Sequence, residues 1–400
     1  MMATVTIFHN VVWSRHKGAV FTALHNLSTA GSIRYSMVQI ADTETDRIGF
    51  SDVDYSFHRY PMQKLFDGCY EDVPLWKMMG RLTWEVMKAK ADLIVLPGYH
   101  RPEYWAMLFA CVLTRKRRAV FCDSTARDRP RRLLTSVPKR IFFALCDGYF
   151  GFGERSREYL VSLGAKRDRV FVPCQAAALP RSFLTERAFD ERVARRDGNS
   201  PVFLYVGRLS AEKGIDTLLE AFAQVRETVP NATLRIVGTG PMHDTLQASV
   251  DALGVREAVH FTGSLQDEPL SNEYFGAACL VLPSYSEPWG LVVNEALSHG
   301  CPAVVSERCG CVPELVVEGE TGFAFDAGNV PALRDTLLAA LRQFADSAQT
   351  ARACMRTIAR FDPRAAASNI ARGCATMLVG TSDGEAADGE AASNAQRLEQ

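Results

Sequence analysis

The sequence predicts two α/β domains in tandem, each built on a doubly wound, Rossmann-like parallel sheet, with a central cleft between them. Short apolar runs alternate with longer amphipathic stretches, which is the pattern of β-α-β units. The alternation occurs twice, and a stretch rich in Arg, Asp and Glu at residues 181–200 separates the two series. A chain of 400 residues also fits two domains of ordinary size. Ligands of such sheets bind at the carboxyl ends of the strands, so we expect the functional site in the cleft.

The first series predicts a domain at residues 1–190. Its predicted strands are residues 4–9, 33–40, 56–60, 92–97, 119–122, 148–152 and 169–172. The helices predicted between them include residues 18–29, 75–90 and 102–113. The polar stretch that follows predicts a linker with a weak helix inside it, and we place the linker proper at residues 191–200.

The second series predicts a domain at residues 201–361. Its predicted strands are residues 202–206, 233–237, 258–261, 279–283 and 302–306. Its predicted helices are residues 214–228, 242–253, 291–299, 330–344 and 347–359. A Phe-Asp-Pro run at 361–363 breaks the chain before a last helix that we expect to end near Val379. The tail at residues 381–400 is rich in Gly, Ala, Ser and Glu and is expected to be disordered.

The composition excludes several classes of protein. Hydrophobic residues make up 47% and charged residues 23%, so a largely disordered chain is excluded. Forty-five basic against forty-six acidic residues give a net charge of −1, which removes a global electrostatic argument for nucleic-acid binding. No apolar run reaches the roughly eighteen residues of a membrane span. The first ten residues predict a strand and not a signal peptide.

The eleven cysteines are scattered and form no C-x-x-C pair. A disulfide framework and a structural zinc site are therefore not expected, and most cysteines should be small buried apolar residues. This cysteine usage predicts a reducing, cytoplasmic compartment.

The most informative stretch, residues 286–295, contains two glutamates eight residues apart. Glu287 and Glu295 bracket a predicted strand-to-helix turn, and eight helical residues span about 12 Å, roughly the reach of a sugar diphosphate with its ribose. Gly290 lies where the helix begins, and free amides at a helix N-terminus bind phosphate groups. The spacing indicates that Glu287 holds sugar hydroxyls and Glu295 a ribose diol; the alternative is a solvated glutamate beside an ordinary helix cap.

A second stretch, residues 205–214, places two cations just past the end of a predicted strand. Arg208 and Lys213 flank the turn into the next helix, where cations can neutralise a departing diphosphate. Taken alone this pattern is weak, because Arg and Lys in a loop are usually solvated.

Together the two stretches resemble retaining glycosyltransferases of the GT4 family, which have the GT-B fold. Similar motifs occur at residues 236–241, 279–284, 310–315 and 319–323. The resemblance covers about residues 202–359 and is only architectural before them. It implies a GT-B fold in which a C-terminal helix at residues 362–380 packs back onto the N-terminal domain.

The resemblance assigns roles to individual side chains. In the family the first glutamate of the pair contacts the donor sugar and the second binds the ribose. These positions are Glu287 and Glu295 here. The family's diphosphate-binding Arg and Lys match Arg208 and Lys213.

The resemblance also implies backbone contacts with the donor. The backbone around Gly290 and Leu291 would hold the distal phosphate. The loop around Gly238 and Gly240 would line the nucleotide pocket, and Leu265 would flank the base.

The N-terminal half departs from the family pattern. Family members often carry a Gly-Gly pair after the first strand, whereas this chain has the single Gly18, whose amide we expect to approach the donor phosphate or the acceptor. The family's His after a middle strand is also missing. Asp123 stands in that segment and is expected to contact the donor sugar or the acceptor nucleophile, although a turn or helix-cap role is equally consistent with it.

The expected chemistry needs no metal or other cofactor. Cleavage of a sugar–phosphate bond requires stabilisation of charge on the departing diphosphate, which Arg208, Lys213 and the amides near Gly290 can supply. No nucleophile pair is visible, and the resemblance implies front-face attack, in which the leaving phosphate takes the acceptor proton. Asp52 and Asp54 match a D-x-D metal motif, but such short acidic patterns are common by chance.

Residues 115–140 carry ten basic residues interleaved with apolar ones. This segment predicts contact with an anionic membrane surface, at about 1 kcal/mol per basic residue close to it. The alternative is a solvated helix face, and nucleic acid is not expected.

The sequence thus predicts a cytoplasmic, retaining glycosyltransferase, peripheral to the inner face of the plasma membrane. It would use a nucleotide-diphosphate sugar and a glycan or lipid-linked glycan acceptor in surface polysaccharide synthesis. The alternatives are an epimerase or phosphorylase on the same fold, or a non-catalytic subunit that binds a nucleotide or glycan.

Overall fold

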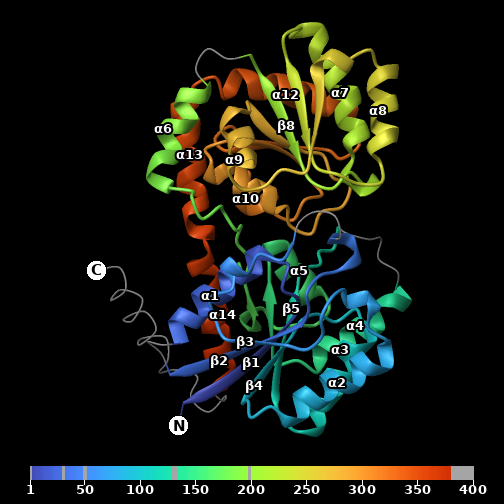
Figure 1. The fold of residues 1–400 in the computed structure, drawn as a ribbon, viewed down its shortest axis with the longest axis vertical. Helices are drawn as coiled ribbons and strands as arrows, with labels where there is room; N and C mark the ends of the chain where they lie inside the picture. Colours follow the sequence, from blue (N-terminus) through green and yellow to red (C-terminus); the bar gives the residue numbers. More distant parts are fainter. Residues whose placement is uncertain (1, 29–31, 48–51, 128–132, 197–199, 380–400) are drawn as a thin grey trace.

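The structure is a computed structural model. The residues that it describes are 2–28, 32–47, 52–127, 133–196 and 200–379. They form two α/β domains, one above the other, and the C-terminal helices run along both (Figure 1). Each domain contains a parallel sheet with helices on both faces, so the predicted fold class is confirmed. The tail predicted to be disordered lies outside the described residues.

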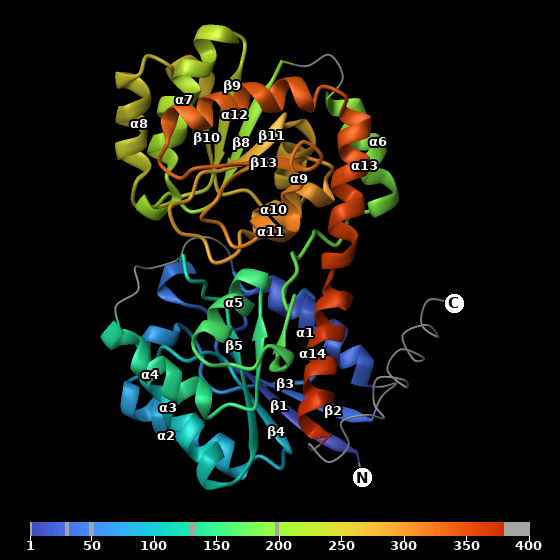
Figure 2. The same cartoon turned by 180° about the vertical axis from the view of Figure 1, so that it is seen from behind.

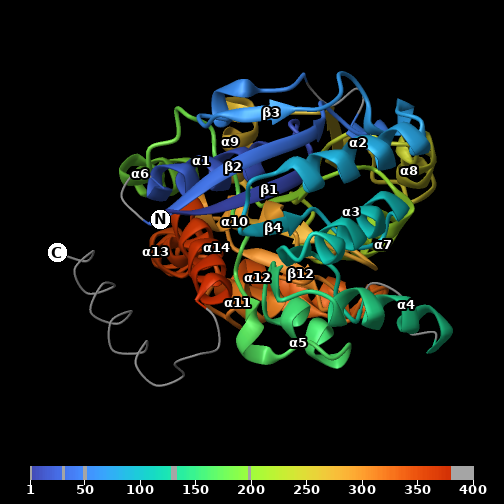
Figure 3. The same ribbon diagram turned by 90° about the horizontal axis from the view of Figure 1, so that it is seen from below.

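The N-terminal domain is built on a seven-stranded parallel sheet with the order β3-β2-β1-β4-β5-β6-β7. Its strands are β1 Ala3–Val11, β2 Ile33–Ala41, β3 Met62–Lys64, β4 Leu93–Leu96, β5 Arg117–Cys122, β6 Gly148–Gly151 and β7 Val170–Phe171. Its helices are α1 Arg15–Ser28, α2 Leu75–Lys88, α3 Pro102–Leu113, α4 Leu133–Ala144 and α5 Glu154–Ser162. Helix α1 packs on one face of the sheet, and α2, α3 and α4 pack on the other (Figure 3).

The C-terminal domain is built on a six-stranded parallel sheet with the order β10-β9-β8-β11-β12-β13. Its strands are β8 Val202–Val206, β9 Thr233–Val237, β10 Val259–Gly263, β11 Cys279–Leu282, β12 Ala303–Ser306 and β13 Gly322–Phe325. Its helices are α7 Ile215–Thr228, α8 His243–Ala252, α9 Asp267–Gly276, α10 Leu291–Ser298, α11 Val312–Leu315 and α12 Val330–Gln343.

Central strands in both sheets are apolar at every position. All four residues of β4 and all four of β11 are buried. This follows from the layering, because helices cover both faces of each parallel sheet. The sequence shows these strands as continuous apolar runs for the same reason.

The chain crosses back to the N-terminal domain at its C-terminal end, as the resemblance implies. Helix α13 (Ser347–Ile358) packs in the C-terminal domain, and α14 (Pro363–Leu378) packs beside α1 (Figure 2). Asp362 separates them and caps α14, because its carboxylate accepts a hydrogen bond from the Ala365 amide at 2.7 Å. Ile370 and Met377 of α14 are buried in the core of the N-terminal domain.

The domain boundary lies earlier than the sequence predicts. Helix α6 (Thr185–Arg196) packs on α9 and α13, so it belongs to the C-terminal domain and is not part of a linker. The cause is the buried Arg192, whose Nη1 donates hydrogen bonds to the backbone carbonyls of Tyr274, Phe275 and Ala277 at 2.6–3.0 Å. Residues 197–199 of the predicted linker lie outside the described residues.

The sequence places one strand wrongly and misses several elements. The strand predicted at residues 56–60 is a 3-10 turn at Tyr55–Phe57 followed later by β3. Asp54 causes the turn, because its side chain accepts a hydrogen bond from the Ser56 amide at 3.0 Å. The missed elements include α5 of the N-terminal domain and α9, α11 and β13 of the C-terminal domain.

The basic cluster at residues 115–118 serves the fold more than the surface. The Lys116 ammonium donates hydrogen bonds to the carbonyls of Val86 and Ala89 and so caps the C-terminal end of α2. Arg117 donates to carbonyls at the end of α14, and Arg118 donates to the Leu145 carbonyl. These contacts do not support the prediction that these three cations face a membrane; Arg115 alone in the cluster is exposed.

Candidate functional site

A cavity lies between the two domains and is lined by segments that follow strand ends in both. Its lining from the loop after β1 and the start of α1 is Trp13, Arg15 and His16. Its lining from the C-terminal domain includes Gln266, Asp267, Tyr274, Leu291, Glu295 and His299. The cavity therefore lies at the carboxyl ends of the strands, where parallel sheets bind their ligands.

Glu295 faces this cavity from helix α10. The Tyr274 hydroxyl donates a 2.7 Å hydrogen bond to Glu295 Oε2. Burial raises the pKa of Glu295 to about 7, and the hydrogen bond from Tyr274 opposes this rise only in part. When ionised, this carboxylate has capacity for further hydrogen bonds from a ligand with adjacent hydroxyls.

His299 holds the same region of α10 in place. Its Nδ1 lies 2.7 Å from the Glu295 carbonyl and its Nε2 lies 2.9 Å from the Ser271 hydroxyl. Burial lowers the pKa of His299 to about 4, so the ring is neutral at pH 7. The neutral ring donates at Nδ1 and accepts at Nε2, which satisfies both nitrogens.

Lys213 and Glu287 form an ion pair at the edge of the C-terminal sheet. Lys213 Nζ lies 2.5 Å from Glu287 Oε2, and their side chains are only 19% and 15% exposed. Lys213 comes from the loop after β8 and Glu287 from the loop after β11, neighbouring strands whose carboxyl ends meet at the same edge. The predicted cation and carboxylate are thus brought together.

Gly290 sets the start of α10. It has a φ of 101°, in the left-handed region that favours glycine, and a Cβ there would lie 2.8 Å from the Leu282 side chain. Within the described part of the chain, no side chain caps the helix, whose first residue is Leu291. The amides of the first turn are therefore placed to bind an anion, as the sequence predicts.

Arg208 lies in the same loop as Lys213 but is engaged locally. Its Nη2 lies 3.0 Å from Glu212 Oε1, and its side chain is 33% exposed. The Ser210 hydroxyl donates to the same carboxylate oxygen at 2.6 Å. A role of Arg208 on a diphosphate remains a prediction.

The glycines after β9 permit two loops to approach closely. A Cβ on Gly238 would lie 1.9 Å from the Gly207 carbonyl oxygen, and one on Gly240 would lie 2.4 Å from the Leu209 carbonyl oxygen. These glycines therefore have a packing reason, and their contact with a nucleotide remains a prediction. Leu265 is partly buried and stands next to Gln266, which lines the cavity.

The structure treats the two N-terminal residues predicted for the site, Asp123 and Gly18, differently. Asp123 is exposed directly after β5, where its charge acts on Lys17, and its contact with a substrate remains a prediction. The Gly18 amide donates to the Ser14 carbonyl at 2.9 Å within the first turn of α1. The predicted contact of that amide with a phosphate or acceptor is therefore not supported; Gly18 instead makes room for the His58 ring, 2.8 Å from where a Cβ would lie.

Asp54 of the D-x-D motif takes part in an ion-pair bridge between the domains. Arg15 lies 3.2 Å from Asp54 and 3.0 Å from Asp267, which is on α9 in the other domain. The described residues include no cluster of three His, Cys, Asp or Glu side chains arranged as metal ligands.

Comparison with known proteins decides the family of the C-terminal half. Residues 186–354 match the family model described as glycosyl transferases group 1. This region spans α6 to α13 and contains Lys213, Glu287 and Glu295. Over this region the chain is similar to group 1 glycosyltransferases.

Relatives of this region occur in a plant and in bacteria. The chain is 34% identical over 182 residues to sulfoquinovosyl transferase SQD2 of Arabidopsis thaliana, covering 45% of this chain and 34% of that protein. It is 35% identical over 181 residues to glycogen synthase of Mycobacterium tuberculosis, covering 45% and 44%. It is 37% identical over 143 residues to a GDP-mannose-dependent phosphatidylinositol monomannoside mannosyltransferase of Mycolicibacterium smegmatis, covering 34% and 37%. The chain thus matches less than half the length of each of these relatives.

Solved glycosyltransferase structures share the two-domain architecture. The lipopolysaccharide outer core galactosyltransferase WaaB matches with a TM-score of 0.67 at 16% identity, covering 94% of this chain and 99% of that chain. Anabaena Alr3699/HepE in complex with UDP matches with a TM-score of 0.69 at 18% identity, covering 94% and 100%. At these identities the likeness establishes the GT-B fold alone.

The first turn of α1 contains a buried lysine that sequence reasoning missed. Lys17 is 5% exposed, and its Nζ has no hydrogen-bond partner among the residues that the structure describes. The ammonium lies 4.6 Å from the centre of the Phe121 ring and 5.2 Å from that of Phe152. Burial lowers the pKa of Lys17 to about 8. The one available signal was a cation directly before Gly18 in the loop after the first strand.

Replacing Lys17 with methionine should stabilise the protein. At pH 7 the change removes a buried charge, and we expect the free energy of unfolding to rise by about 1–3 kcal/mol. Because the folded-state pKa lies below that of an unfolded lysine, the gain should be complete below pH 8 and disappear as the pH rises toward the unfolded pKa. Urea unfolding at pH 7 and at pH 10 measures this, with the exposed Lys166→Met as control. A loss of stability at pH 7 would mean that a partner for the ammonium exists.

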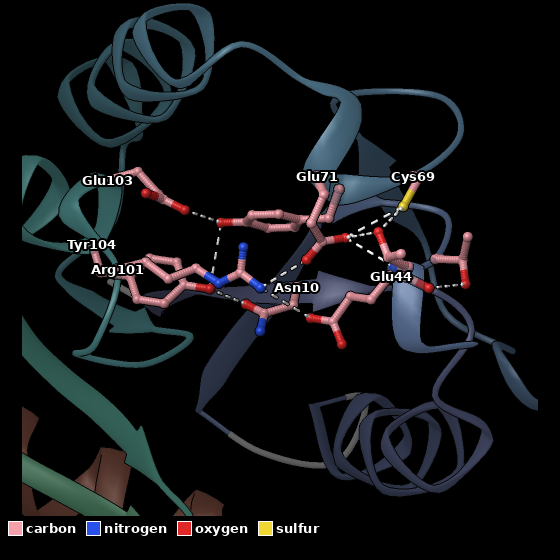
Figure 4. Close-up of polar contacts among 10 residues, drawn as sticks. Asn10, Glu44, Cys69, Glu71, Arg101, Glu103 and Tyr104 are labelled. Atoms are coloured by element: carbon pink, nitrogen blue, oxygen red, sulfur yellow. Dashed lines mark hydrogen bonds and ion pairs between the residues drawn. The ribbon is translucent and has the colours of Figure 1, made fainter. Parts of the chain in front are cut away.

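A polar network forms a rim at the carboxyl ends of strands in the N-terminal sheet (Figure 4). The Arg101 guanidinium stacks 4.2 Å from the Tyr70 ring centre and pairs with Glu71 at 2.9 Å. The Tyr104 hydroxyl donates to Asn10 Oδ1 at 2.7 Å. These residues come from the end of β1 and from the segments that follow β3 and β4, so the network ties three parts of the N-terminal domain together.

Proposed function

We propose that this protein is a GT4-type retaining glycosyltransferase that transfers a sugar from a nucleotide-diphosphate sugar to a glycan or lipid-linked glycan acceptor. The observation that carries the proposal is the arrangement of Lys213, Glu287 and Glu295 around the start of α10. A nucleotide sugar has three chemically different parts, the ribose, the diphosphate and the sugar. We assign one of these three side chains to each part.

Each group has a distinct task in the proposed donor complex. Glu295 accepts hydrogen bonds from the ribose diol, and Glu287 accepts them from sugar hydroxyls. Lys213 and the amides at the N-terminus of α10 hold the diphosphate, with Arg208 beside them. Related proteins support the donor class, because HepE is solved with UDP-glucose and the Mycolicibacterium smegmatis relative is a GDP-mannose-dependent mannosyltransferase.

The proposed reaction exchanges one bond at the anomeric carbon for another. The bond from that carbon to the diphosphate oxygen breaks as the acceptor oxygen attacks from the same face. The acceptor proton passes to the departing phosphate oxygen, and Lys213 stabilises the charge that develops there. We propose that this step proceeds without a metal cofactor, in the cytoplasm, as part of surface polysaccharide synthesis.

A thermal-shift panel with UDP, GDP, dTDP, ADP and CMP, each with magnesium or with EDTA, tests the donor site. Stabilisation by one diphosphate that persists in EDTA supports the proposal and identifies the base. Absence of any shift would favour a non-catalytic subunit. Conversion of the matching sugar nucleotide without an acceptor would favour the epimerase or phosphorylase alternatives.

A further inference from the structure

Helices α2, α3 and α4 lie side by side on the outer surface of the N-terminal domain (Figures 1 and 2). They carry nine of the seventeen large apolar side chains that are exposed in the described part of the chain. The most prominent are Trp76, Trp84, Met87, Phe109, Leu113 and Ile141. We call this surface the three-helix face.

The side chains of the three-helix face are not those that pack the helices against the sheet. Helix α2 already has a buried stripe formed by Met78, Leu82 and Val86. Trp76 and Trp84 lie outside that stripe and are 77% and 60% exposed. Large apolar side chains that are exposed on three neighbouring helices are typical of a docking site.

Charge on these helices favours an anionic partner. The acidic residues of α2 and α3, Glu85 and Glu103, are each only 3% exposed. Helix α4 has no acidic residue in its sequence. Lys77, Arg115 and Arg140 are exposed around the apolar side chains.

We propose that the three-helix face docks onto an anionic phospholipid surface. Tryptophan prefers the membrane–water interface, and basic side chains around an apolar surface bind anionic headgroups. The protein would lie on the bilayer without crossing it: no helix within the described residues has the length and hydropathy of a membrane span. A second copy of the chain fits this surface less well, because a two-fold contact would bring the same basic side chains together.

Docking at this face would place the cleft beside the bilayer. Helix α2 begins three residues after Asp72, the end of the 3-10 turn that contributes Tyr70 and Glu71 to the rim network. An acceptor anchored in the same bilayer could then reach the cleft from the rim. This last step rests on the proposed function, whereas lipid binding itself does not.

Sedimentation of the full chain with vesicles tests the proposal. We expect binding to vesicles of phosphatidylcholine mixed with phosphatidylglycerol, weaker binding to phosphatidylcholine alone, and a decrease as salt is added. The variant Trp76→Ser/Trp84→Ser/Leu113→Ser should lose at least about tenfold in the bound-to-free ratio. A matched control replaces exposed apolar residues elsewhere, Leu27→Ser/Val161→Ser/Val317→Ser, and should bind as the unmodified protein does.

Three outcomes would overturn the proposal. They are absence of binding to anionic vesicles, equal loss in both triple variants, and a dimer in light scattering that the Trp76/Trp84/Leu113 variant dissociates while vesicles remain unbound. Thermal shift with the nucleotide diphosphate, run on the same variants, separates this proposal from the donor site. Lost vesicle binding with an intact shift affects only the docking face, and a lost shift with intact vesicle binding affects only the proposed function.

Discussion

Replacing Lys213 with alanine is expected to lower glycosyl transfer by about 10²–10³-fold. The lysine is the cation closest to Glu287, at 2.5 Å, and the pair is largely shielded from water. Its loss removes the charge that would stabilise the leaving diphosphate. Initial rates with a radiolabelled donor measure the effect, and a circular dichroism melt checks that the variant is folded.

A matched control exists on the surface of the same domain. Arg256 forms an ion pair with Asp251 that is also 2.5 Å long, but both side chains are more than half exposed. Exposed pairs contribute little, so Arg256→Ala should leave both rate and stability nearly unchanged. Equal rates in Lys213→Ala and Arg256→Ala would contradict the proposed role of Lys213.

Replacing Glu295 with glutamine is expected to remove a pH dependence from nucleotide binding. The raised pKa of Glu295 means that its carboxyl group is protonated below about pH 7 in the free protein. The ionised form accepts hydrogen bonds from a diol, so nucleotide affinity should rise between pH 6 and pH 8. In Glu295→Gln the affinity should be lower and lack this rise. Isothermal titration with the nucleotide diphosphate found in the panel measures both curves.

Three other titratable side chains that line the cavity do not titrate in this range. His299 has a pKa of about 4, and burial also lowers the pKa of His16 well below its ordinary value. The Tyr274 hydroxyl stays protonated, because burial raises its pKa. The difference between the two curves therefore reports on Glu295, since ionisation of the nucleotide is common to both. The same rise in affinity in Glu295→Gln would exclude this assignment.

Stability provides an independent check on Glu295. A carboxyl group with a raised folded-state pKa destabilises the fold once the unfolded chain ionises, so its contribution worsens from about pH 4.5 to pH 7 and then stays constant. Glu295→Gln should therefore unfold with a free energy about 1–3 kcal/mol higher at pH 8, and with little change at pH 4. Higher stability together with weaker nucleotide binding is typical of a residue retained for function.

Much of the site on the C-terminal domain was accessible from the sequence. Glu287, Gly290 and Glu295 lie within one short segment, so their spacing in the sequence is enough to predict a strand-to-helix turn. Lys213 is distant in sequence, but it follows β8, and β8 pairs with β11. The carboxyl ends of paired parallel strands coincide, which is why two loop motifs could be assigned to one site.

The site residues of the N-terminal domain were harder to predict from the sequence, because their importance depends on which distant side chains bury them. Lys17 is distinctive only because its buried ammonium lies over the rings of Phe121, in β5, and Phe152, directly after β6. Gly18 was interpreted through its amide, whereas its packing against His58 explains it. Neither environment can be inferred from a loop of ten residues taken alone.

The sequence by itself determined that two β-α-β series form two domains and that a carboxylate pair and a cation gather where their strands end. Only the tertiary structure decided which charges face water. Three adjacent cations, Lys116 to Arg118, look like a surface patch in the sequence, yet they donate to carbonyls on helices elsewhere in the chain. The helical pattern at residues 75–90 does not show that Trp76 and Trp84 are exposed, which the structure decides. The physical reason is that periodicity and spacing are local, whereas burial and partners come from elements far away in the sequence.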